Sequence, residues 1–360
     1  LVSTRKIFAN ALSSLDRYGF MTPQAFVDPV MIVWNFTDNC NLSCEHCYQS
    51  AKALNTEERE SELNLEERLK VVDIISEMNT PSLFFSGGEP LIENDFWPVA
   101  RKAKDEGLYL SIATNGTLID RKMADRLADI GIGYVQVSID AADPERHDEI
   151  RGVPGMWKRA VDGIKNLLDA GVTTCIAYTH MKNTHDQIRD IFKLREELGA
   201  YKVVVYNYIP VGRGNIENDP TPEQRKELHR IMYDELDSGR HVVATTDPTF
   251  GAFCRRNESR SLVLAHYADL KADELGSIAE VVGGCGAGRA YAAIQPDGRF
   301  TPCVYMPDTT IGNVLEEPMS VLWNEHPLMK LFKSRKGIEC MCPPEDEKVC
   351  GGCRARAYQY

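Results

Sequence analysis

Short apolar runs alternate with longer helical patterns from residue 31 onward, and this alternation constrains the fold more than any other feature of the chain. Six runs rich in β-branched and aromatic residues predict strands over 31–36, 82–86, 109–114, 134–139, 174–179 and 202–209. Between them, apolar residues at three and four spacing predict helices over 64–78, 120–130, 156–170 and 185–198. Strands that alternate with helices in this way are typical of βα units on a parallel sheet. The sequence therefore predicts an α/β fold.

Six consecutive βα units are too few to close an eight-stranded barrel. We therefore expect a partial (β/α)6 barrel, similar to three quarters of a TIM barrel, with a lateral opening that admits a large substrate. In parallel barrels the functional residues gather at the C-terminal ends of the strands. The chemistry of this chain is expected at that end of the barrel.

The sequence pattern divides the chain into four segments. Residues 1–30 form a lead segment, and the partial barrel spans 31–238, which includes a last helix predicted over 221–238. A poorly patterned connector follows over 239–280. From 281 to 360 glycines and cysteines become dense and helical periodicity fades, so this segment has too little apolar content for a core of its own. We expect a small C-terminal domain that is held together by metal.

The composition argues against several classes of protein. A net charge of −12 and a pI of about 5.3 leave no basic stripe for a phosphate backbone, so no nucleic-acid partner is expected. No stretch approaches the roughly 20 apolar residues that cross a bilayer, and residues 1–10 lack the apolar core of a signal peptide. These features predict no membrane span and a cytoplasmic location. The chain starts at Leu1 rather than Met and ends abruptly at Tyr360, so we expect both ends to be trimmed.

Three of the eleven cysteines, Cys40, Cys44 and Cys47, follow the first predicted strand directly. In a reducing compartment such short spacings indicate metal ligation rather than disulfides. Three thiolates from one loop can hold three irons of a cubane and leave the fourth iron open for reaction. A structural zinc site is the alternative, but it requires four ligands, usually as two pairs. The spacing therefore favours a reactive [4Fe-4S] cluster.

The spacing C-x3-C-x2-C, with His46 just before its last cysteine, resembles the motif of the radical SAM superfamily. A second mark is the run 86–90, Ser-Gly-Gly-Glu-Pro, which looks like the glycine-glycine-glutamate motif of that family. The resemblance implies that Gly87, Gly88 and Glu89 hold the methionine amino group of S-adenosylmethionine. It also implies reductive cleavage of S-adenosylmethionine to methionine and a 5'-deoxyadenosyl radical, which abstracts hydrogen from a substrate. His46 is expected to pack beside the cluster, with metal ligation as the alternative.

Four more polar residues stand at or after the ends of predicted strands. By the same resemblance Asn115, Ser138 and Asp140 face the ribose or carboxylate of S-adenosylmethionine, and Arg151 pairs with its carboxylate. Three of them have a structural alternative: a β-turn for Asn115, a helix cap for Asp140 and a surface salt bridge for Arg151. No catalytic side chain is assigned beyond the cluster ligands. Cys175, inside a predicted strand, is interpreted as a buried core thiol.

The cysteines after residue 281 resemble the SPASM domain, which many radical SAM enzymes append to their barrel. The resemblance implies two auxiliary [4Fe-4S] clusters, one held by Cys285, Cys303 and Cys353 and the other by Cys340, Cys342 and Cys350.

The spacing of these C-terminal cysteines departs from the usual SPASM pattern. The usual seventh cysteine is absent, and the gaps that separate Cys340, Cys342, Cys350 and Cys353 differ from those of the family. Two zinc sites therefore stay an alternative for this domain. Cys254 is a candidate fourth ligand of the inner cluster, with a structural thiol as its alternative.

Two substrate classes are compatible with the sequence. The runs 351–358 and 210–214 look most like the branch of SPASM enzymes that contains haem-biosynthesis decarboxylases and peptide-maturation enzymes. We expect a peptide substrate, because that use is commoner, with oxidative decarboxylation of a porphyrin as the alternative. A reaction of this kind needs an external electron donor such as ferredoxin or flavodoxin. An iron-sulfur protein that only transfers electrons is the alternative from another class, but it would not need a cofactor cleft.

Overall fold

A ten-stranded sheet organises the part of the chain that this computed structural model describes, namely residues 26–53, 62–238, 240, 242–257, 261–264, 268–271, 284–334 and 350–360. From β12 to β9 each strand is parallel to its neighbour, whereas β12, β13 and β14 pair in antiparallel fashion. In spatial order the strands are β14 (Gly312–Asn313), β13 (Arg299–Thr301), β12 (Tyr291–Ile294), β1 (Met31–Asn35), β4 (Ser82–Ser86), β5 (Tyr109–Thr114), β6 (Ile132–Ser138), β7 (Thr174–His180), β8 (Val203–Asn207) and β9 (Val243–Thr245).

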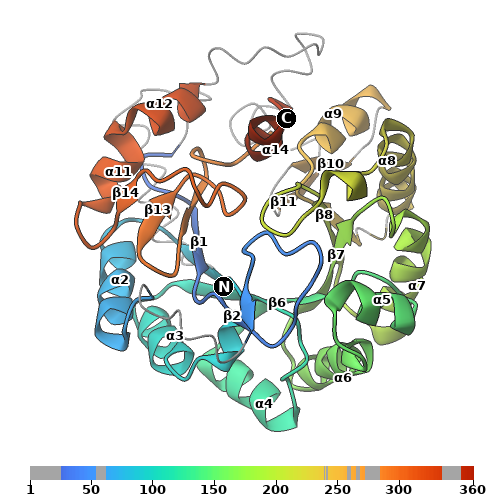
Figure 1. Cartoon of the computed structure of the whole chain (residues 1–360), viewed down its shortest axis with the longest axis horizontal. Helices are drawn as coiled ribbons and strands as arrows, with labels where there is room; N and C mark the ends of the chain where they lie inside the picture. Colours follow the sequence, from blue (N-terminus) through green and yellow to red (C-terminus); the bar gives the residue numbers. More distant parts are fainter. Residues whose placement is uncertain are drawn as a thin grey trace.

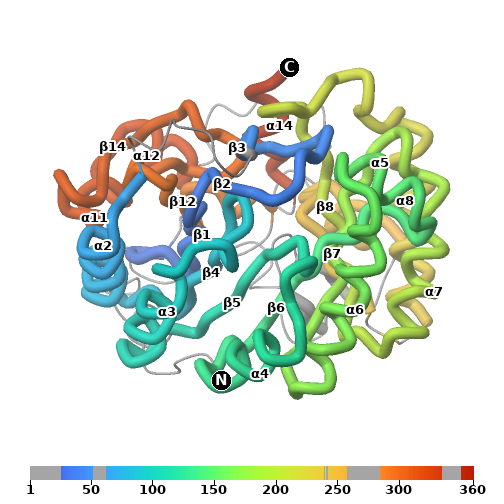
Figure 2. The backbone as a smooth tube through the Cα atoms, turned by 60° about the horizontal axis from the view of Figure 1, so that its bottom comes forward, coloured from blue at the N-terminus to red at the C-terminus, as the bar shows by residue number. Residues whose placement is uncertain are grey.

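Helices surround this sheet on its outer side, as Figure 1 shows. In Figure 2 the strands β1, β4, β5, β6, β7 and β8 follow one another in chain order inside the helices. The sequence-predicted α/β class and partial barrel are confirmed. The helices are α2 (Leu65–Glu77), α3 (Phe96–Asp105), α4 (Arg121–Ile130), α5 (Pro144–Arg151), α6 (Met156–Asp169), α7 (Ile188–Leu198), α8 (Pro222–Asp237), α9 (Thr249–Arg256), α11 (Met319–Glu325), α12 (Pro327–Ser334) and α14 (Arg354–Gln359).

Local sequence signals explain where the predicted helices begin and end. The Asn64 side chain accepts from the Glu67 N–H at the start of α2, and the Glu67 side chain accepts in return from the Asn64 N–H. At the start of α4 the Asp120 side chain accepts from the Met123 N–H. This helix ends at Gly131, which has the left-handed conformation that glycine adopts freely. Such caps satisfy backbone groups that the first and last turns leave without partners.

The main core lies between the sheet and its outer helices. An aromatic cluster of Trp34, Phe36, Phe85 and Phe96 fills the space between β1, β4 and α3, with ring centroids 5.1–6.2 Å apart. All four side chains are fully buried. Because both faces of a covered parallel sheet are buried, its strands consist of nearly continuous apolar runs, which is why the sequence predicted them well.

One edge strand of the sheet, β9, lies outside the six predicted strands. The connector predicted over 239–280 contains β9, which pairs with β8, and the helix α9. Three residues are too short a run for any periodicity, so the sequence pattern did not reveal this strand. Also in that region, β10 (Ser261–Leu264) and β11 (Ala268–Lys271) form a separate two-stranded sheet.

The C-terminal segment continues the barrel sheet through β12, which pairs with β1 from Met31↔Tyr291 to Trp34↔Ile294. Its apolar residues, among them Ile294, Phe300 and Trp323, belong to the same core cluster as the barrel. The sequence analysis expected this segment to lack a core of its own, and its side chains indeed share the core of the barrel. The predicted division into a barrel and a separate C-terminal domain near residue 281 stays a prediction.

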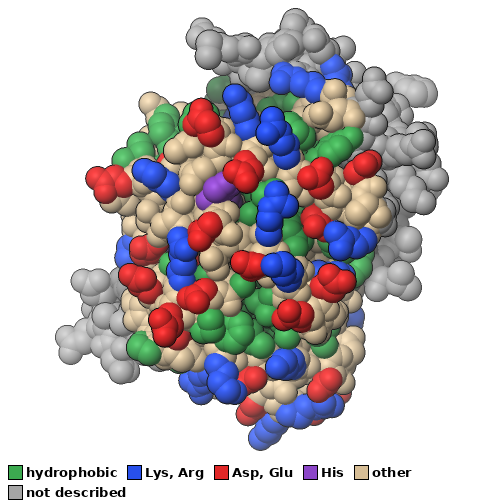
Figure 3. Space-filling view, turned by 90° about the vertical axis from the view of Figure 1, so that its right-hand side faces the viewer, with side chains coloured by type: hydrophobic (Ala, Val, Ile, Leu, Met, Phe, Trp, Pro, Cys, Tyr) green, Lys and Arg blue, Asp and Glu red, His purple; other side chains and the backbone are tan. Residues whose placement is uncertain are grey.

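The surface over α5, α7 and α8 mixes acidic and basic side chains, as Figure 3 shows. Ion pairs such as Arg146–Asp186 at 2.8 Å and Lys193–Asp190 at 2.7 Å account for part of this pattern. The net negative charge is therefore not gathered into one patch on that face. In the described ranges, no helix is long and apolar enough to cross a membrane.

Candidate active site

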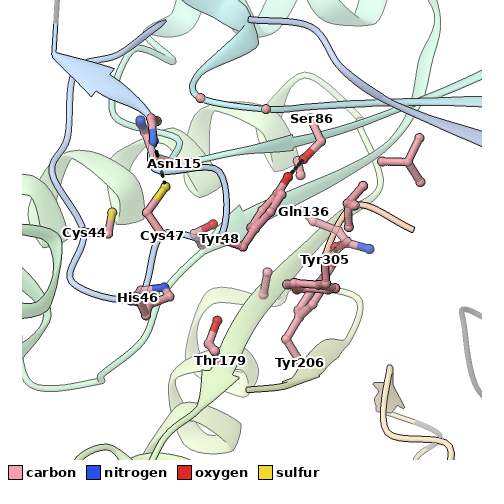
Figure 4. A pocket seen from close by; sticks show the side chains of 18 of the residues that line it. Cys44, His46, Cys47, Tyr48, Ser86, Asn115, Gln136, Thr179, Tyr206 and Tyr305 are labelled. Carbon is pink, nitrogen blue, oxygen red and sulfur yellow. Dashed lines mark hydrogen bonds between the residues drawn. The ribbon is translucent and has the colours of Figure 1, made fainter. Parts of the chain in front are cut away.

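A cavity opens at the C-terminal ends of the parallel strands, where the sequence analysis expected the chemistry. Its lining residues come from strands β1, β4, β5, β6, β7, β8 and β12, from Thr246 just after β9, from the loop that follows β1, and from the C-terminal segment. Figure 4 shows Cys44 and Cys47 on one side of this cavity and Gln136, Tyr206 and Tyr305 on the other. We call Cys40, Cys44 and Cys47 the thiol-rich wall of the cavity. We call Tyr48, Tyr206 and Tyr305 its tyrosine-rich wall.

The thiol-rich wall is the loop predicted to hold a cluster. Cys40 ends the short strand β2 (Asn39–Cys40), and Cys40, Cys44 and Cys47 all line the cavity. Arg213 holds this loop in place: its Nε donates to the Cys44 carbonyl at 3.0 Å, its Nη1 to the Ala51 carbonyl at 2.7 Å, and its backbone N–H to the Cys47 carbonyl at 2.9 Å. The loop is thus fixed by its backbone, which leaves the three thiols available to a ligand.

Burial favours the protonated form of two of these thiols. It raises the pKa of Cys40 to about 12, and the nearby carboxyl of Glu89 adds to this effect. Burial also raises the pKa of Cys44, although the Arg151 guanidinium, whose Nη1 lies 3.5 Å from the Cys44 Sγ, opposes the shift. A metal that binds here must displace the thiol protons.

Arg151, Asp140 and His46 form a buried group beneath the cysteine loop. An Arg151 Nη2 lies 2.6 Å from the Asp140 Oδ2, and the His46 Nε2 lies 3.4 Å from the same oxygen. Burial, the largest single influence, opposes ionisation of Asp140, but Arg151, His46, His147 and the Thr179 N–H together outweigh it and lower the pKa of this carboxyl. Burial lowers the pKa of His46 to about 4, so its ring is neutral near pH 7.

This geometry differs from the surface salt bridge considered for Arg151, because both partners are buried. Arg151 lines the cavity, whereas Asp140 lies behind it and accepts from the Thr179 N–H at 3.2 Å. The Arg151 Nε is also buried and finds no hydrogen-bond partner among the described residues. A guanidinium that lines the cavity suits the carboxylate of a bound ligand.

The glycine turn packs flush against the segment that leads to the cysteines. Gly88 donates its N–H to the Thr37 carbonyl at 2.7 Å, and Glu89 donates to the Asn39 carbonyl at 2.8 Å. A Cβ on Gly87, whose φ is +120°, would lie 2.6 Å from the Thr37 carbonyl oxygen, and one on Gly88 would collide with the Asn39 carbonyl. Only glycine permits this approach.

Glu89 lies behind the cavity rather than in its lining. Its fully buried carboxylate accepts from the Asn115 N–H at 2.7 Å, from the Thr114 hydroxyl at 2.9 Å and from the Leu91 N–H at 3.2 Å. Burial raises the pKa of Glu89 to about 7 despite these donors. The side chain therefore joins the glycine turn to the end of β5.

Asn115 and Ser138 do line the cavity, as the sequence analysis expected. The Asn115 Nδ2 donates to the Asn41 Oδ1 at 2.8 Å and lies 3.9 Å from the Cys40 Sγ, so it connects the end of β5 with the cysteine loop. The structure thus brings together the three cysteines and five of the seven predicted cofactor residues on one cavity, namely Gly87, Gly88, Asn115, Ser138 and Arg151, while Glu89 and Asp140 support them from behind.

A second group of cysteines lies beside the same cavity. Cys285 and Cys303 are buried in one small apolar cluster against which Cys353 packs. Burial, followed by the charges of Cys285 and Cys303, raises the pKa of Cys353 well above its usual range. Cys285 and Cys303 are buried and Cys353 is partly exposed beside them. Cysteine thiols gathered in this way are the ligand type that iron-sulfur clusters take.

The other C-terminal cysteines are placed differently. Cys350 is buried and its Sγ accepts from the Gly352 N–H at 3.3 Å, whereas Cys340 and Cys342 lie outside the described residues. Cys254 is fully buried on α9 and belongs to the main barrel core, not to the apolar cluster of Cys285 and Cys303. Cys175 is also fully buried, in β7.

Comparison with known proteins agrees with this arrangement. The family model "Radical SAM superfamily" matches residues 34–195, and the SPASM model, an iron-sulfur cluster-binding domain, matches residues 285–354. An AdoMet-dependent heme synthase from Methanosarcina barkeri is 31% identical over 332 residues, which cover 92% of each chain. The chain belongs to the radical SAM superfamily. It is an enzyme with a C-terminal SPASM domain, and the predicted cofactors, a [4Fe-4S] cluster that binds S-adenosylmethionine and auxiliary clusters, are confirmed by these matches.

Two more distant matches extend the comparison of this radical SAM enzyme. A PqqA peptide cyclase from Gluconobacter oxydans is 24% identical over 337 residues, covering 91% of this chain and 86% of that protein. The structure of Streptococcus suis SuiB bound to S-adenosylmethionine superposes with a TM-score of 0.73 at 18% identity, over 99% of this chain and 79% of SuiB. The second match supports the fold.

Sequence reasoning missed the tyrosine-rich wall of this radical SAM enzyme. Tyr48 donates its hydroxyl to the Asn35 Oδ1 at 2.9 Å, and its ring centroid lies 5.0 Å from that of Tyr305. Tyr206 donates to the Gln136 Oε1 at 2.5 Å. One signal was available, because Gln136 is a polar residue in the apolar run that became β6. Tyr305 comes from the C-terminal segment, and only the tertiary structure places it here.

Proposed function

We propose that this radical SAM enzyme oxidatively decarboxylates a propionate side chain of a tetrapyrrole. The observation that carries the proposal is the tyrosine-rich wall that faces the three cysteines. The rings of Tyr48, Tyr206 and Tyr305 offer flat apolar surface to a conjugated macrocycle. The side-chain amide N–H of Gln136, which also lines the cavity, provides a donor for a carboxylate of that macrocycle. The AdoMet-dependent heme synthase that is 31% identical adds support.

The residues of the thiol-rich wall and their neighbours would bind the cofactors. Cys40, Cys44 and Cys47 would hold the cluster, and the guanidinium of Arg151, oriented by Asp140, would bind the carboxylate of S-adenosylmethionine. Asn115 and Ser138 would contact the remaining polar groups of that cofactor. When bound, the cluster and S-adenosylmethionine supply a 5'-deoxyadenosyl radical.

The proposed reaction balances in atoms and electrons. One hydrogen atom leaves the propionate carbon next to the ring, the bond to the carboxylate breaks, carbon dioxide departs and a vinyl group remains. One electron is left over for each propionate and needs an acceptor. The apolar side chains of the cavity, such as Met31, Val33 and Phe84, would keep water away from the substrate radical.

The test uses protein whose clusters are reconstituted without oxygen. With S-adenosylmethionine, a strong reductant and coproporphyrin III, with or without iron, we expect 5'-deoxyadenosine together with a product that has lost one carbon dioxide and two hydrogens per propionate. Mass spectrometry detects both. The proposal is wrong if 5'-deoxyadenosine forms and every tetrapyrrole tested is returned unchanged.

The sequence analysis preferred a peptide substrate, and the PqqA peptide cyclase keeps that class open. We rank it second because that relative is 24% identical, against 31% for the heme synthase, over similar lengths. The ranking would be reversed if a peptide substrate stimulated formation of 5'-deoxyadenosine and no tetrapyrrole did. We further propose that ferredoxin or flavodoxin supplies the electrons.

A further inference from the structure

Tyr291 connects the active-site cavity with the second cysteine group. It is the first residue of β12, it is buried, and it lines the cavity. Its hydroxyl lies 2.9 Å from the Sγ of Cys303, which follows β13 in the same hairpin. One side chain therefore reaches both the space for the substrate and a sulfur of the predicted auxiliary cluster.

The direction of this hydrogen bond follows from ligation. In the free protein either atom can donate, because both carry a hydrogen. A sulfur that ligates iron has lost its proton, so it can only accept. Once a cluster is bound, the Tyr291 hydroxyl must be the donor.

The surroundings of the pair make this donor effective. Val33, Phe84, Met306 and Phe332 belong to the same buried cluster as Tyr291 and Cys303. In such apolar surroundings a hydrogen bond is electrostatically stronger than in water. Hydrogen bonds to cluster sulfurs are among the factors that set reduction potentials. A donor stabilises the more negative, reduced state of the cluster and so raises its potential.

We propose that Tyr291 is a positioning residue that donates a hydrogen bond to the Cys303 sulfur and raises the reduction potential of the auxiliary cluster held by Cys285, Cys303 and Cys353. The inference rests on the proposed ligand set of that cluster and deepens the proposed function. A cluster tuned in this way takes up an electron from the cavity more readily, such as the one left over by each decarboxylation.

The experiment is a redox titration followed by electron paramagnetic resonance on reconstituted wild-type protein and Tyr291→Phe. We expect the auxiliary cluster of the variant to be about tenfold harder to reduce, which corresponds to ~59 mV for one electron. The cluster at Cys40, Cys44 and Cys47 should keep its potential. Tyr178→Phe is the matched control, because Tyr178 is fully buried and its hydroxyl donates to the Thr184 carbonyl at 2.7 Å, away from the cysteines.

A second measurement covers the case in which Tyr291→Phe does not retain the auxiliary cluster. Replacing all tyrosines with 3-fluorotyrosine makes each phenol a stronger donor, so the auxiliary potential should rise in otherwise wild-type protein. An unchanged potential in the fluorinated protein, or an equal shift of both clusters in Tyr291→Phe, overturns the proposal. Neither titration contains substrate, so a failure of the tetrapyrrole proposal leaves the result intact.

Discussion

The two cysteine groups of this enzyme lie beside the same cavity but are assembled in different ways. Cys40, Cys44 and Cys47 come from eight consecutive residues, and one loop brings them together. Cys285, Cys303 and Cys353 come from three separate segments: the approach to β12, the end of the β12–β13 hairpin and the start of α14. The first group depends on local spacing, whereas the second depends on how the C-terminal segment packs against the barrel.

Their chemical surroundings differ as well. The Cys44 sulfur has a cation beside it, since the Arg151 Nη1 lies 3.5 Å away. The Cys303 sulfur has a neutral phenol beside it, the hydroxyl of Tyr291. The comparison suggests that the first group is built to bind a cofactor that carries a carboxylate at the metal, and the second to exchange electrons in apolar surroundings.

The largest expected effect is that of replacing the first group. A variant with Cys40→Ala, Cys44→Ala and Cys47→Ala should form no 5'-deoxyadenosine above background, because nothing remains to hold the iron that binds S-adenosylmethionine. Its iron content should fall by about four atoms per chain, the content of one cubane. Cys175→Ala, a buried thiol outside the cavity lining, is the control. If the triple variant loses all iron, the two groups are not independent.

Replacing the second group should separate cofactor cleavage from turnover. We expect a variant with Cys285→Ala, Cys303→Ala and Cys353→Ala to lose about four iron atoms per chain. It should still form 5'-deoxyadenosine in the absence of substrate, but it should form no product. Iron analysis and product assays measure this. Cys254→Ala sharpens the result: unchanged iron makes Cys254 a core thiol, as its place in the barrel core indicates. An unchanged iron content in the triple variant would contradict the proposed ligands.

A smaller effect is expected from replacing Arg151, the cation beside the Cys44 sulfur. Lysine lacks the planar fork of arginine, so Arg151→Lys should weaken both the contact with Asp140 and the grip on a carboxylate. We expect the KM for S-adenosylmethionine to rise about tenfold or more, since one such charged contact contributes about 1.5–3 kcal/mol. Arg146→Lys is the control on the same helix, because its pair with Asp186 is exposed and worth little. Equal KM values for the two variants would refute the role of Arg151.

The smallest effect concerns how the second group is held. Asp219, in the loop between β8 and α8, accepts from both terminal nitrogens of Arg356 on α14, and the side chain of Cys353 caps that helix. Asp219→Asn should lower the free energy of unfolding by about 1.5–3 kcal/mol and reduce auxiliary iron without affecting the first cluster. Thermal unfolding and iron analysis test this, with Asp190→Asn on the exposed face of α7 as control. A variant with normal iron and normal stability would show that α14 needs no such anchor.

Much of the fold could be predicted because buried parallel strands leave a clear pattern. The six apolar runs became β1, β4, β5, β6, β7 and β8. The strand β9 could not be found, since three residues carry no period, and the pairing of β12 with β1 could not be found either, because no local signal states which strand a distant hairpin joins.

At the site, the sequence identified residue types better than their positions. Asn115, Ser138 and Arg151 line the cavity, whereas the carboxylates of Glu89 and Asp140 lie behind its wall, where they accept from Asn115 and pair with Arg151. The expected contacts of these residues with the cofactor stay predictions. A motif shows that a carboxylate is needed, but the direction in which it points depends on neighbours from other strands.

The sequence by itself determined the three-cysteine loop and the αβ units that carry it, because both are short-range patterns of spacing and burial. Only the tertiary structure decided the tyrosine-rich wall, since its rings come from the loop after β1, the end of β8 and the C-terminal segment, which lie far apart in the chain. The contact between Tyr291 and Cys303 has a shorter range and depends on the pairing of β12 with β13. The physical reason is that spacing fixes neighbours within a loop or helix, whereas contacts between distant segments depend on how sheet edges pair and side chains pack.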